Sequence, residues 1–255
     1  MSAPSAPPTS SSTPTSSTST SSADTSAPVS GSLAISALDL AALVCSRVCH
    51  DLISPVGAIV NGIEVMEEDK NEETKTFALE LIKKSAHQAS AKLQFCRLAF
   101  GAAGSAGAQI DLGDAEKAAR GLIEDGKTTL VWNLPRALLA KNRVKLLLNM
   151  VLIATGGIPR GGTLTVDPVP GDDGIAGFVV TASGLNAKLN PTTAELLTGN
   201  SAHTVDAHAI QPLYAGILAR DCGLVLSATS DAGVVTLTAR LQSEEKAEQT
   251  QPLAS

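Results

Sequence analysis

The sequence is short of basic charge and of any signal for export or membrane insertion. Nineteen Lys and Arg against 25 Asp and Glu give a formal net charge of −6, which argues against nucleic acid as the main partner. The N-terminus has neither a basic start nor an apolar run, so it does not resemble a secretory signal. We also expect no apolar stretch long enough to span a membrane. These absences predict a soluble, cytoplasmic protein.

Cysteine is also scarce, and the four cysteines present are too few for a disulfide framework. Cys45, Cys49 and His50 have the residue types of a metal cluster. Helical spacing, however, places both cysteines on an apolar face and the histidine on the opposite one, and no second ligand pair follows at a useful distance. We therefore expect the cysteines to be small buried core residues and predict no metal site.

Both ends of the chain are poor in residues that build a core. Residues 1–33 are almost entirely Ser, Thr, Pro and Ala, and the segment 243–255 is polar. Too little apolar surface is present there to offset the entropy of ordering, so we expect a disordered leader and a loose tail. The small residues of the segment 101–108 predict a flexible linker. It separates a first domain, residues 34–102, from a second, residues 109–242.

The most informative stretch is residues 44–66, VCSRVCHDLISPVGAIVNGIEVM. At the helical advance of about 100° per residue, it separates into an apolar face and a polar face. The apolar face holds Cys45, Val48, Cys49, Leu52, Val56, Ile59, Val60, Ile63 and Met66, and the opposite face holds Arg47, His50, Ser54, Gly57, Asn61 and Glu64. His50 lies near the middle of the polar face. A helix that presents one outward imidazole is a candidate phosphoryl carrier.

The first helix is expected to begin at Ser36 or Asp39, either of which could cap it, and to end near Glu68. Pro55 lies inside it and should bend it about one turn beyond His50. A second helix is expected over residues 73–100, where apolar residues recur at spacings of three, four and seven. A single hairpin cannot bury apolar faces this broad on both of its helices, whereas two hairpins can bury them by pairing as a four-helix bundle. We therefore predict a homodimer.

Beyond the linker the periodicity changes repeatedly. Helices are expected over residues 112–123, 136–154 and 206–221, and strands over residues 128–132, 163–166, 177–181, 224–228 and 234–240. Strand pairs interleaved with helices predict an α+β sandwich, in which the helices pack on one face of a mixed sheet. The fold class is thus a helical hairpin followed by an α+β domain.

The run His50-Asp51-Leu52-Ile53-Ser54-Pro55 resembles the phosphoacceptor box of histidine kinases, in which an acidic residue follows the histidine and a proline comes later. The resemblance implies that the hairpin corresponds to the dimerisation and phosphotransfer domain of those kinases. It also implies that residues from about 110 to 240 correspond to their ATP-binding domain.

The second half departs from the kinase pattern at the positions that bind the nucleotide. Asn149 matches the first asparagine of the kinase asparagine box, but Ile153 stands where the second one binds magnesium. Ala182 stands in place of the aspartate that contacts adenine, Asn186 replaces the last glycine of that box, and residues 210–214 replace the glycine-rich lid. Isoleucine cannot coordinate a metal, and alanine cannot accept a hydrogen bond from adenine. We predict a degenerate site that does not use ATP.

A kinase-like shell with an intact histidine and a degenerate nucleotide pocket resembles a family of alphaproteobacterial histidine phosphotransferases. The resemblance implies transfer of a phosphoryl group from a receiver-domain aspartate to His50, and then to a response-regulator aspartate. The implied partners are the receiver domain of a CckA-like hybrid histidine kinase and CtrA-like and CpdR-like response regulators. No cofactor of the protein's own is expected, because the receiver would supply Mg²⁺.

Three residues are candidates for the chemistry. His50 is the phosphoacceptor; Asp51 either orients the far ring nitrogen or faces solvent, and Arg47 either steadies phosphate oxygens or is a solvated helix residue. The candidate partner contacts are Ile53, Ser54, Gly57, Asn61 and Glu64, with Val60 as a further apolar contact. Ile53 and Val60 could instead be wholly buried.

Two other functions fit the same sequence. A working ATP-dependent histidine kinase would bind ATP with magnesium, and a non-catalytic dimeric scaffold would bind regulators without needing His50. DNA binding is a distant third, given the acidic charge and the lack of a basic stripe.

Overall fold

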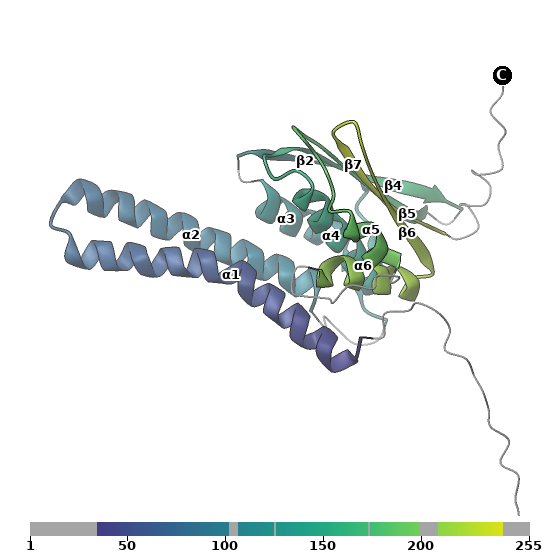
Figure 1. Ribbon diagram of the computed structural model, residues 1–255, viewed down its shortest axis with the longest axis horizontal. Coiled ribbons are helices and arrows are strands. Elements are labelled where there is room, and N and C mark those ends of the chain that lie inside the picture. Colours follow the sequence, from purple (N-terminus) through teal and green to yellow (C-terminus); the bar gives the residue numbers. More distant parts are fainter. Residues whose placement is uncertain (1–34, 102–106, 125, 173, 199–208, 242–255) are drawn as a thin grey trace, which may run out of the picture. The chain divides into compact units, whose positions relative to one another are not determined.

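The computed structural model describes residues 35–101, 107–124, 126–172, 174–198 and 209–241, so the expected leader and tail lie outside these ranges. Two long helices come first, and an α/β domain follows them (Figure 1). In chain order the elements are α1 (Ala37–Glu68), α2 (Glu72–Ala99), β1 (Gln109–Asp111), α3 (Leu112–Ile123), β2 (Thr128–Trp132), β3 (Leu138–Ala140), α4 (Lys141–Gly156), β4 (Gly162–Gly171), β5 (Gly174–Ser183), α5 (Thr192–Thr198), α6 (Ile210–Asp221), β6 (Leu224–Asp231) and β7 (Val234–Leu241).

The two long helices begin at side-chain caps. The Ser36 hydroxyl accepts a hydrogen bond from the backbone N–H of Asp39 at 3.1 Å, which confirms the predicted start of α1. The Asn71 side chain accepts from the backbone N–H groups of Glu73 and Thr74 and starts α2. Each cap satisfies N–H groups that the first helical turn leaves without a partner. The bounds of both helices agree with the prediction to within a residue.

α1 and α2 pack closely at a glycine. A Cβ added to Gly62 would lie 2.6 Å from Ile82 Cγ1 and 3.3 Å from the Ala78 carbonyl oxygen, so only glycine allows this approach. Pro55, the other buried residue of α1, lies on the same side. α1 changes direction part-way along its length in the view of Figure 1, as a proline inside a helix predicts.

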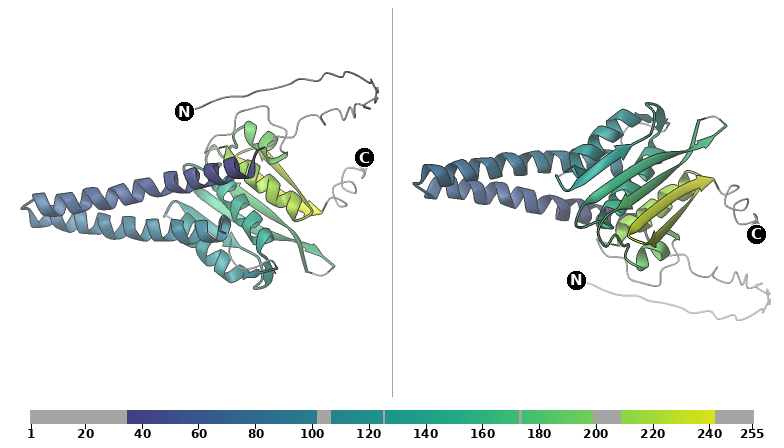
Figure 2. Two further views of the ribbon diagram at one scale, coloured as in Figure 1. Left: turned by 90° about the horizontal axis from the view of Figure 1, so that it is seen from below. Right: turned by 90° about the horizontal axis from the view of Figure 1, so that it is seen from above.

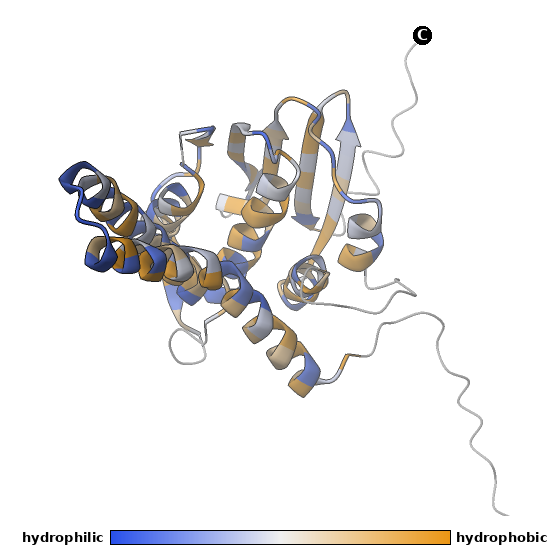
Figure 3. Ribbon diagram, turned by 60° about the vertical axis from the view of Figure 1, so that its left-hand side comes forward, coloured by the Kyte–Doolittle hydropathy of each residue, from blue (hydrophilic) through white to orange (hydrophobic). Residues whose placement is uncertain are grey.

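The hairpin leaves much apolar surface uncovered. Val56, Val60 and Ile63 of α1 and Phe77 and Leu93 of α2 are all more than 40% exposed, and hydrophobic colouring recurs along α1 in Figure 3. α2 therefore covers only one strip of the predicted apolar face of α1, because a single partner helix packs along one side of it. The rest of that face stays exposed.

Cys45 and Cys49 lie on the uncovered part of that face and are exposed. The expectation that they are buried was wrong for the single chain, because α2 does not reach their side of the helix.

One described helix is long and apolar enough, by length and composition alone, to cross a membrane, and it is α1. The expectation that no stretch reaches that length was therefore wrong. Only 6% of its most apolar window is buried within the chain. This apolar surface is thus left uncovered by the described residues.

The second half is built on a five-stranded mixed sheet in the order β2-β4-β5-β7-β6. β2 and β4 pair in parallel, and the other neighbouring strands pair antiparallel. In Figure 2 the view from above shows the strands in front and the helices behind them. The predicted arrangement, helices on one face of a mixed sheet, is confirmed.

Some elements of this domain differ from the prediction. All five predicted strands are present, four of them longer than expected, but β1, β3 and α5 were not predicted. The helix expected from residue 136 begins at Lys141, because residues 138–140 pair with β1 instead. A three-residue strand has no periodicity of its own and forms only when its partner is in place.

The core of the second half includes the end of α2. Phe95 and Ala99 are almost fully buried in the same cluster as residues of α3 and α4. The Asn149 side chain, on α4, donates a hydrogen bond to the backbone carbonyl of Ala99 at 3.1 Å and another to that of Lys145 at 2.8 Å. The last turns of the hairpin are thus fixed to the α/β domain.

Candidate functional site

His50 projects from the polar face of α1, with 60% of its side chain exposed. The outward histidine predicted from helical spacing is confirmed. An exposed imidazole can be reached by a phosphorylated side chain of another protein, whereas a buried one could not.

Asp51 and Arg47 lie beside the imidazole. Arg47 Nε donates to Asp51 Oδ2 at 2.9 Å, one helical turn away. His50 Nδ1 lies 3.5 Å from Asp51 Oδ1, which is long for a strong hydrogen bond and close enough for an ionic contact. Asp51 therefore does not simply face solvent: its carboxylate, about one quarter exposed, lies between the guanidinium and the imidazole.

Lys92 of α2 also reaches this site, and the sequence prediction missed it. Its ammonium group donates to the backbone carbonyl oxygen of Asp51 at 2.7 Å. Burial, and then the negative charge of Asp51, raise the pKa of the nearby Cys96 thiol to about 11, while Arg47 and Lys92 oppose this rise. A carboxylate and two cations thus lie within electrostatic range of one another at the base of His50.

The predicted partner contacts lie on the same helix face as His50. Ile53 is 72% exposed, and Ser54, Asn61 and Glu64 are also exposed. A Cβ at Gly57 would meet no atom within 4 Å, so the surface two turns beyond the histidine is low and open. These residues lie along one face of α1 in line with the imidazole, from Ile53 beside it to Glu64, about 21 Å along the helix from His50. The possibility that Ile53 and Val60 are buried is wrong.

Several residues of the second half that align with the nucleotide-binding positions of histidine kinases are buried in the core. Asn149 is fully buried and hydrogen-bonded to two carbonyl groups. Ile153 and Ala182 belong to the hydrophobic core, and Ile210, where α6 begins, is 1% exposed. Ile153, Ala182 and Ile210 offer no oxygen for magnesium and no acceptor for adenine, and the amide of Asn149 is fully buried, so this set of side chains does not fit ATP.

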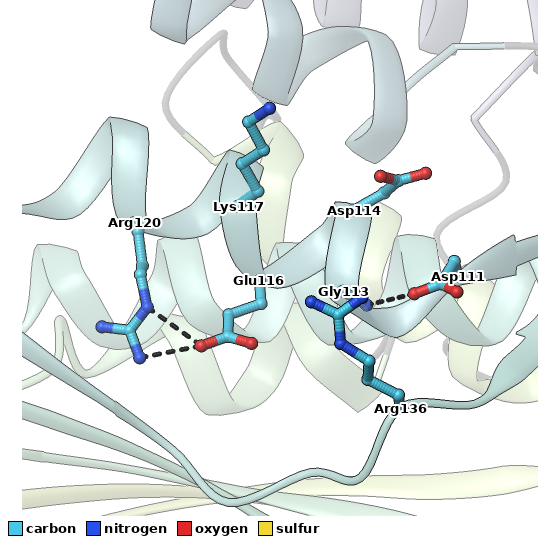
Figure 4. A pocket seen from close by; sticks show the side chains of 7 residues that line it. All are labelled: Asp111, Gly113, Asp114, Glu116, Lys117, Arg120 and Arg136. Carbon is cyan, nitrogen blue, oxygen red and sulfur yellow. Dashed lines mark hydrogen bonds and ion pairs between the residues drawn. The ribbon is translucent and has the colours of Figure 1, made fainter.

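A separate cleft of about 410 Å³ lies at the start of α3. Figure 4 shows that its charges are mixed: Arg120 pairs with Glu116 at 2.8 Å, Asp111 caps the helix through the N–H of Gly113, and Arg136 reaches over the same turn. Three carboxylates and three cations line it, so the formal charges of its side chains cancel.

No group of three or more His, Cys, Asp or Glu side chains that could hold a metal occurs within the described ranges. Cys45 and Cys49 therefore do not form a metal cluster with His50 there. The chemistry available at this site is that of the imidazole, its neighbouring carboxylate and the two cations.

A helical hairpin with an outward histidine, followed by an α/β domain of this topology, is the architecture of a histidine phosphotransfer protein. A family model described as the histidine phosphotransferase C-terminal domain matches residues 112–233. The chain is 49% identical over 208 residues to "Protein phosphotransferase ChpT" of Brucella abortus (strain 2308), which covers 81% of this chain and 98% of that protein. This protein therefore belongs to the histidine phosphotransferase family.

A solved structure supports the same assignment. The chain superimposes on a structure described as a bacterial phosphotransferase with a TM-score of 0.74 and 46% sequence identity, covering 83% of this chain and 100% of the other. The protein is a phosphotransferase of a phosphorelay, and the fold class and the enzymatic class expected from the sequence are confirmed.

Proposed function

We propose that His50 accepts a phosphoryl group from the aspartyl phosphate of one receiver domain and passes it to the aspartate of a second. The observation that carries this proposal is the 60% exposed imidazole with a carboxylate 3.5 Å from Nδ1. Nδ1 lies on the side of Asp51, so the proposed phosphoryl acceptor is Nε2, the ring nitrogen farther from that carboxylate. The second transfer reverses the first.

In the first step the Nε2 lone pair forms the P–N bond while the P–O bond to the receiver aspartate breaks. The electron pair of the broken bond leaves with the aspartate oxygen, and the proton on Nδ1 stays there. The ring thereby becomes cationic, and the carboxylate of Asp51 offsets this charge. Arg47 holds that carboxylate in place at 2.9 Å. Transfer of this kind depends mainly on alignment and charge neutralisation.

Receiver domains are the partner class of a phosphorelay phosphotransferase. We propose that they dock over the exposed face formed by Ile53, Ser54, Gly57, Asn61 and Glu64. Ile53 supplies apolar contact close to the histidine, and Gly57 lets a partner helix approach closely. The receiver of a CckA-like hybrid kinase is the expected donor, and CtrA-like and CpdR-like regulators are the expected acceptors. The receiver would bring the Mg²⁺ required for aspartate chemistry.

We also propose that the protein is a homodimer and acts in the cytoplasm. The support is the uncovered apolar surface of the hairpin, which continues from Val56 and Ile63 of α1 to Leu79 and Leu93 of α2. A second hairpin packed against this surface would form a four-helix bundle and would bury the part of α1 that is apolar enough for a membrane. The histidine lies on another face of α1, so dimer formation leaves it exposed.

The protein is proposed to work without ATP. The support is the set of side chains at the nucleotide positions, of which Ile153 and Ala182 are apolar core residues and Asn149 is engaged in packing. Magnesium-dependent binding of labelled ATP, or labelling of the protein by ATP alone, would favour a histidine kinase instead.

The test is to mix the protein with a phosphorylated receiver domain and to follow acid-labile label on the phosphotransferase. Wild type should gain label and then lose it to a second receiver, and His50→Ala should gain none. Because the side chain is mostly exposed, His50→Ala should keep the fold and the dimer, which circular dichroism and light scattering would verify. A non-catalytic scaffold predicts that His50→Ala leaves signalling through the protein unchanged.

A further inference from the structure

Pro55 leaves the backbone carbonyl of Asp51 without its usual helical partner. In an α-helix the carbonyl of residue i accepts from the N–H of residue i+4. The residue four positions after Asp51 is Pro55, which has no N–H. A part-buried carbonyl left unpaired in this way is unfavourable, and it belongs to the residue next to the phosphoacceptor.

The ammonium group of Lys92 takes the place of the missing N–H. It donates to Asp51 O at 2.7 Å in a part-buried setting, from a position 41 residues further along the chain. A hydrogen bond from a charged donor is stronger than one between neutral groups. The bond joins α2 to the turn of α1 in which Pro55 removes a backbone hydrogen bond. This turn includes Asp51, the residue next to His50.

We propose that Lys92 is a positioning residue for phosphotransfer: it fixes the interrupted turn of α1 against α2 and so holds His50 in the orientation that receivers require. This inference rests on the proposed function of His50. Lys92 acts through the backbone of Asp51 and does not contact the phosphoryl group. The alignment of a nucleophile controls the rate strongly, since a displacement of about 1 Å can cost about 100-fold.

The decisive comparison is Lys92→Met in two backgrounds. With Pro55 present, Lys92→Met should slow transfer from a phosphorylated receiver by about tenfold or more, and Lys92→Arg, which keeps a charged donor, should restore most of the rate. In a Pro55→Ala background, residue 55 regains an N–H that can reach Asp51 O. Lys92→Met should then cost less than about twofold. Lys83→Met, an exposed lysine on the same helix, is the matched control and should be neutral in both backgrounds.

An equal loss in both backgrounds would overturn the proposal, because it would mean that Lys92 acts on the receiver or the phosphoryl group directly. Full activity of Lys92→Met with Pro55 present would overturn it as well.

Hydrogen exchange provides a measurement that does not depend on phosphoryl transfer. Amides of residues 47–58 should exchange about tenfold faster in Lys92→Met than in wild type, as expected for loss of a charge-assisted bond, and this difference should vanish in the Pro55→Ala background. If wild type takes no label from any receiver, the proposed function fails, and the exchange result then decides only whether Lys92 fixes the interrupted turn of α1. Unchanged exchange in Lys92→Met would refute that role.

Discussion

Replacing Asn149 with Asp tests whether this residue serves packing or a nucleotide. The change is nearly isosteric, yet it replaces an N–H donor with an oxygen. In the structure the Asn149 side chain is fully buried, and its Nδ2 donates to the carbonyls of Ala99 and Lys145. A carboxylate there would face two carbonyl oxygens without a donor. Asn149→Asp should therefore destabilise the protein, although a surface nucleotide-site residue would tolerate it.

The size of the effect follows from the pKa of the new side chain. A buried carboxyl avoids its charge by staying protonated, and its folded-state pKa then lies well above the unfolded value of about 3.9. Keeping it protonated at pH 7 costs about 4 kcal/mol, and losing one of the two hydrogen bonds adds about 1 kcal/mol. A total near 5 kcal/mol is comparable with the whole stability of many domains, about 5–15 kcal/mol.

The sign of the pH dependence distinguishes this cause from a simple packing defect. Because the folded pKa is raised, the deficit of Asn149→Asp is smallest below about pH 4 and grows by about 1.4 kcal/mol per pH unit as pH rises. Urea unfolding of wild type and Asn149→Asp at pH 5.5 and 7.5 measures the loss of unfolding free energy at each pH. Asn61→Asp, at an exposed position, is the control. A deficit under 1 kcal/mol at pH 7.5, or one that does not change with pH, would refute the reasoning.

Four further outcomes are expected. Gly57→Ala should raise stability by up to about 1 kcal/mol, because a Cβ there meets nothing within 4 Å, whereas Gly57→Gln should slow receiver-dependent labelling in the same label-transfer assay without lowering the melting temperature. Val56→Glu should shift the protein from dimer to monomer in light scattering, because it charges the uncovered apolar seam, and a dimer that persists would contradict the proposed interface. Arg47→Met should slow transfer several-fold while receiver binding by calorimetry is unchanged, since Arg47 holds Asp51 at 2.9 Å. Alkylation of the Cys96 thiol should be slow at pH 8 and accelerate toward pH 11, because burial raises its pKa to about 11, and fast reaction at pH 8 would contradict that environment.

The hairpin and the position of the histidine could be predicted from the sequence because both follow from local rules. Ser36 is a good N-cap, and a spacing of 3.6 residues places His50 opposite the apolar residues whatever lies around the helix. The same spacing could not show that Cys45 and Cys49 stay outside the seam with α2. Which part of a broad apolar face a neighbour covers depends on how the two helices cross, and here they pack closely at Gly62.

The contacts that were missed join residues far apart in the chain. Pro55 signals that the Asp51 carbonyl needs an outside donor, but helix α2 offers several lysines, and only packing selects Lys92. The short strands β1 and β3 exist because they pair with each other. Asn149 was matched to a nucleotide box by spacing, and its bond to Ala99 depends on where α2 ends in space.

The way α2 ends has a practical consequence for anyone dissecting the molecule. Phe95 and Ala99 are buried in the same core as residues of α3 and α4, so a fragment cut at the small-residue segment after residue 101 would leave a cavity in the core of the C-terminal piece. The same cut would strip the N-terminal piece of the support for its final turns. Fragments of the two halves should therefore overlap, with residues 92–101, which include the last two turns of α2, present in both.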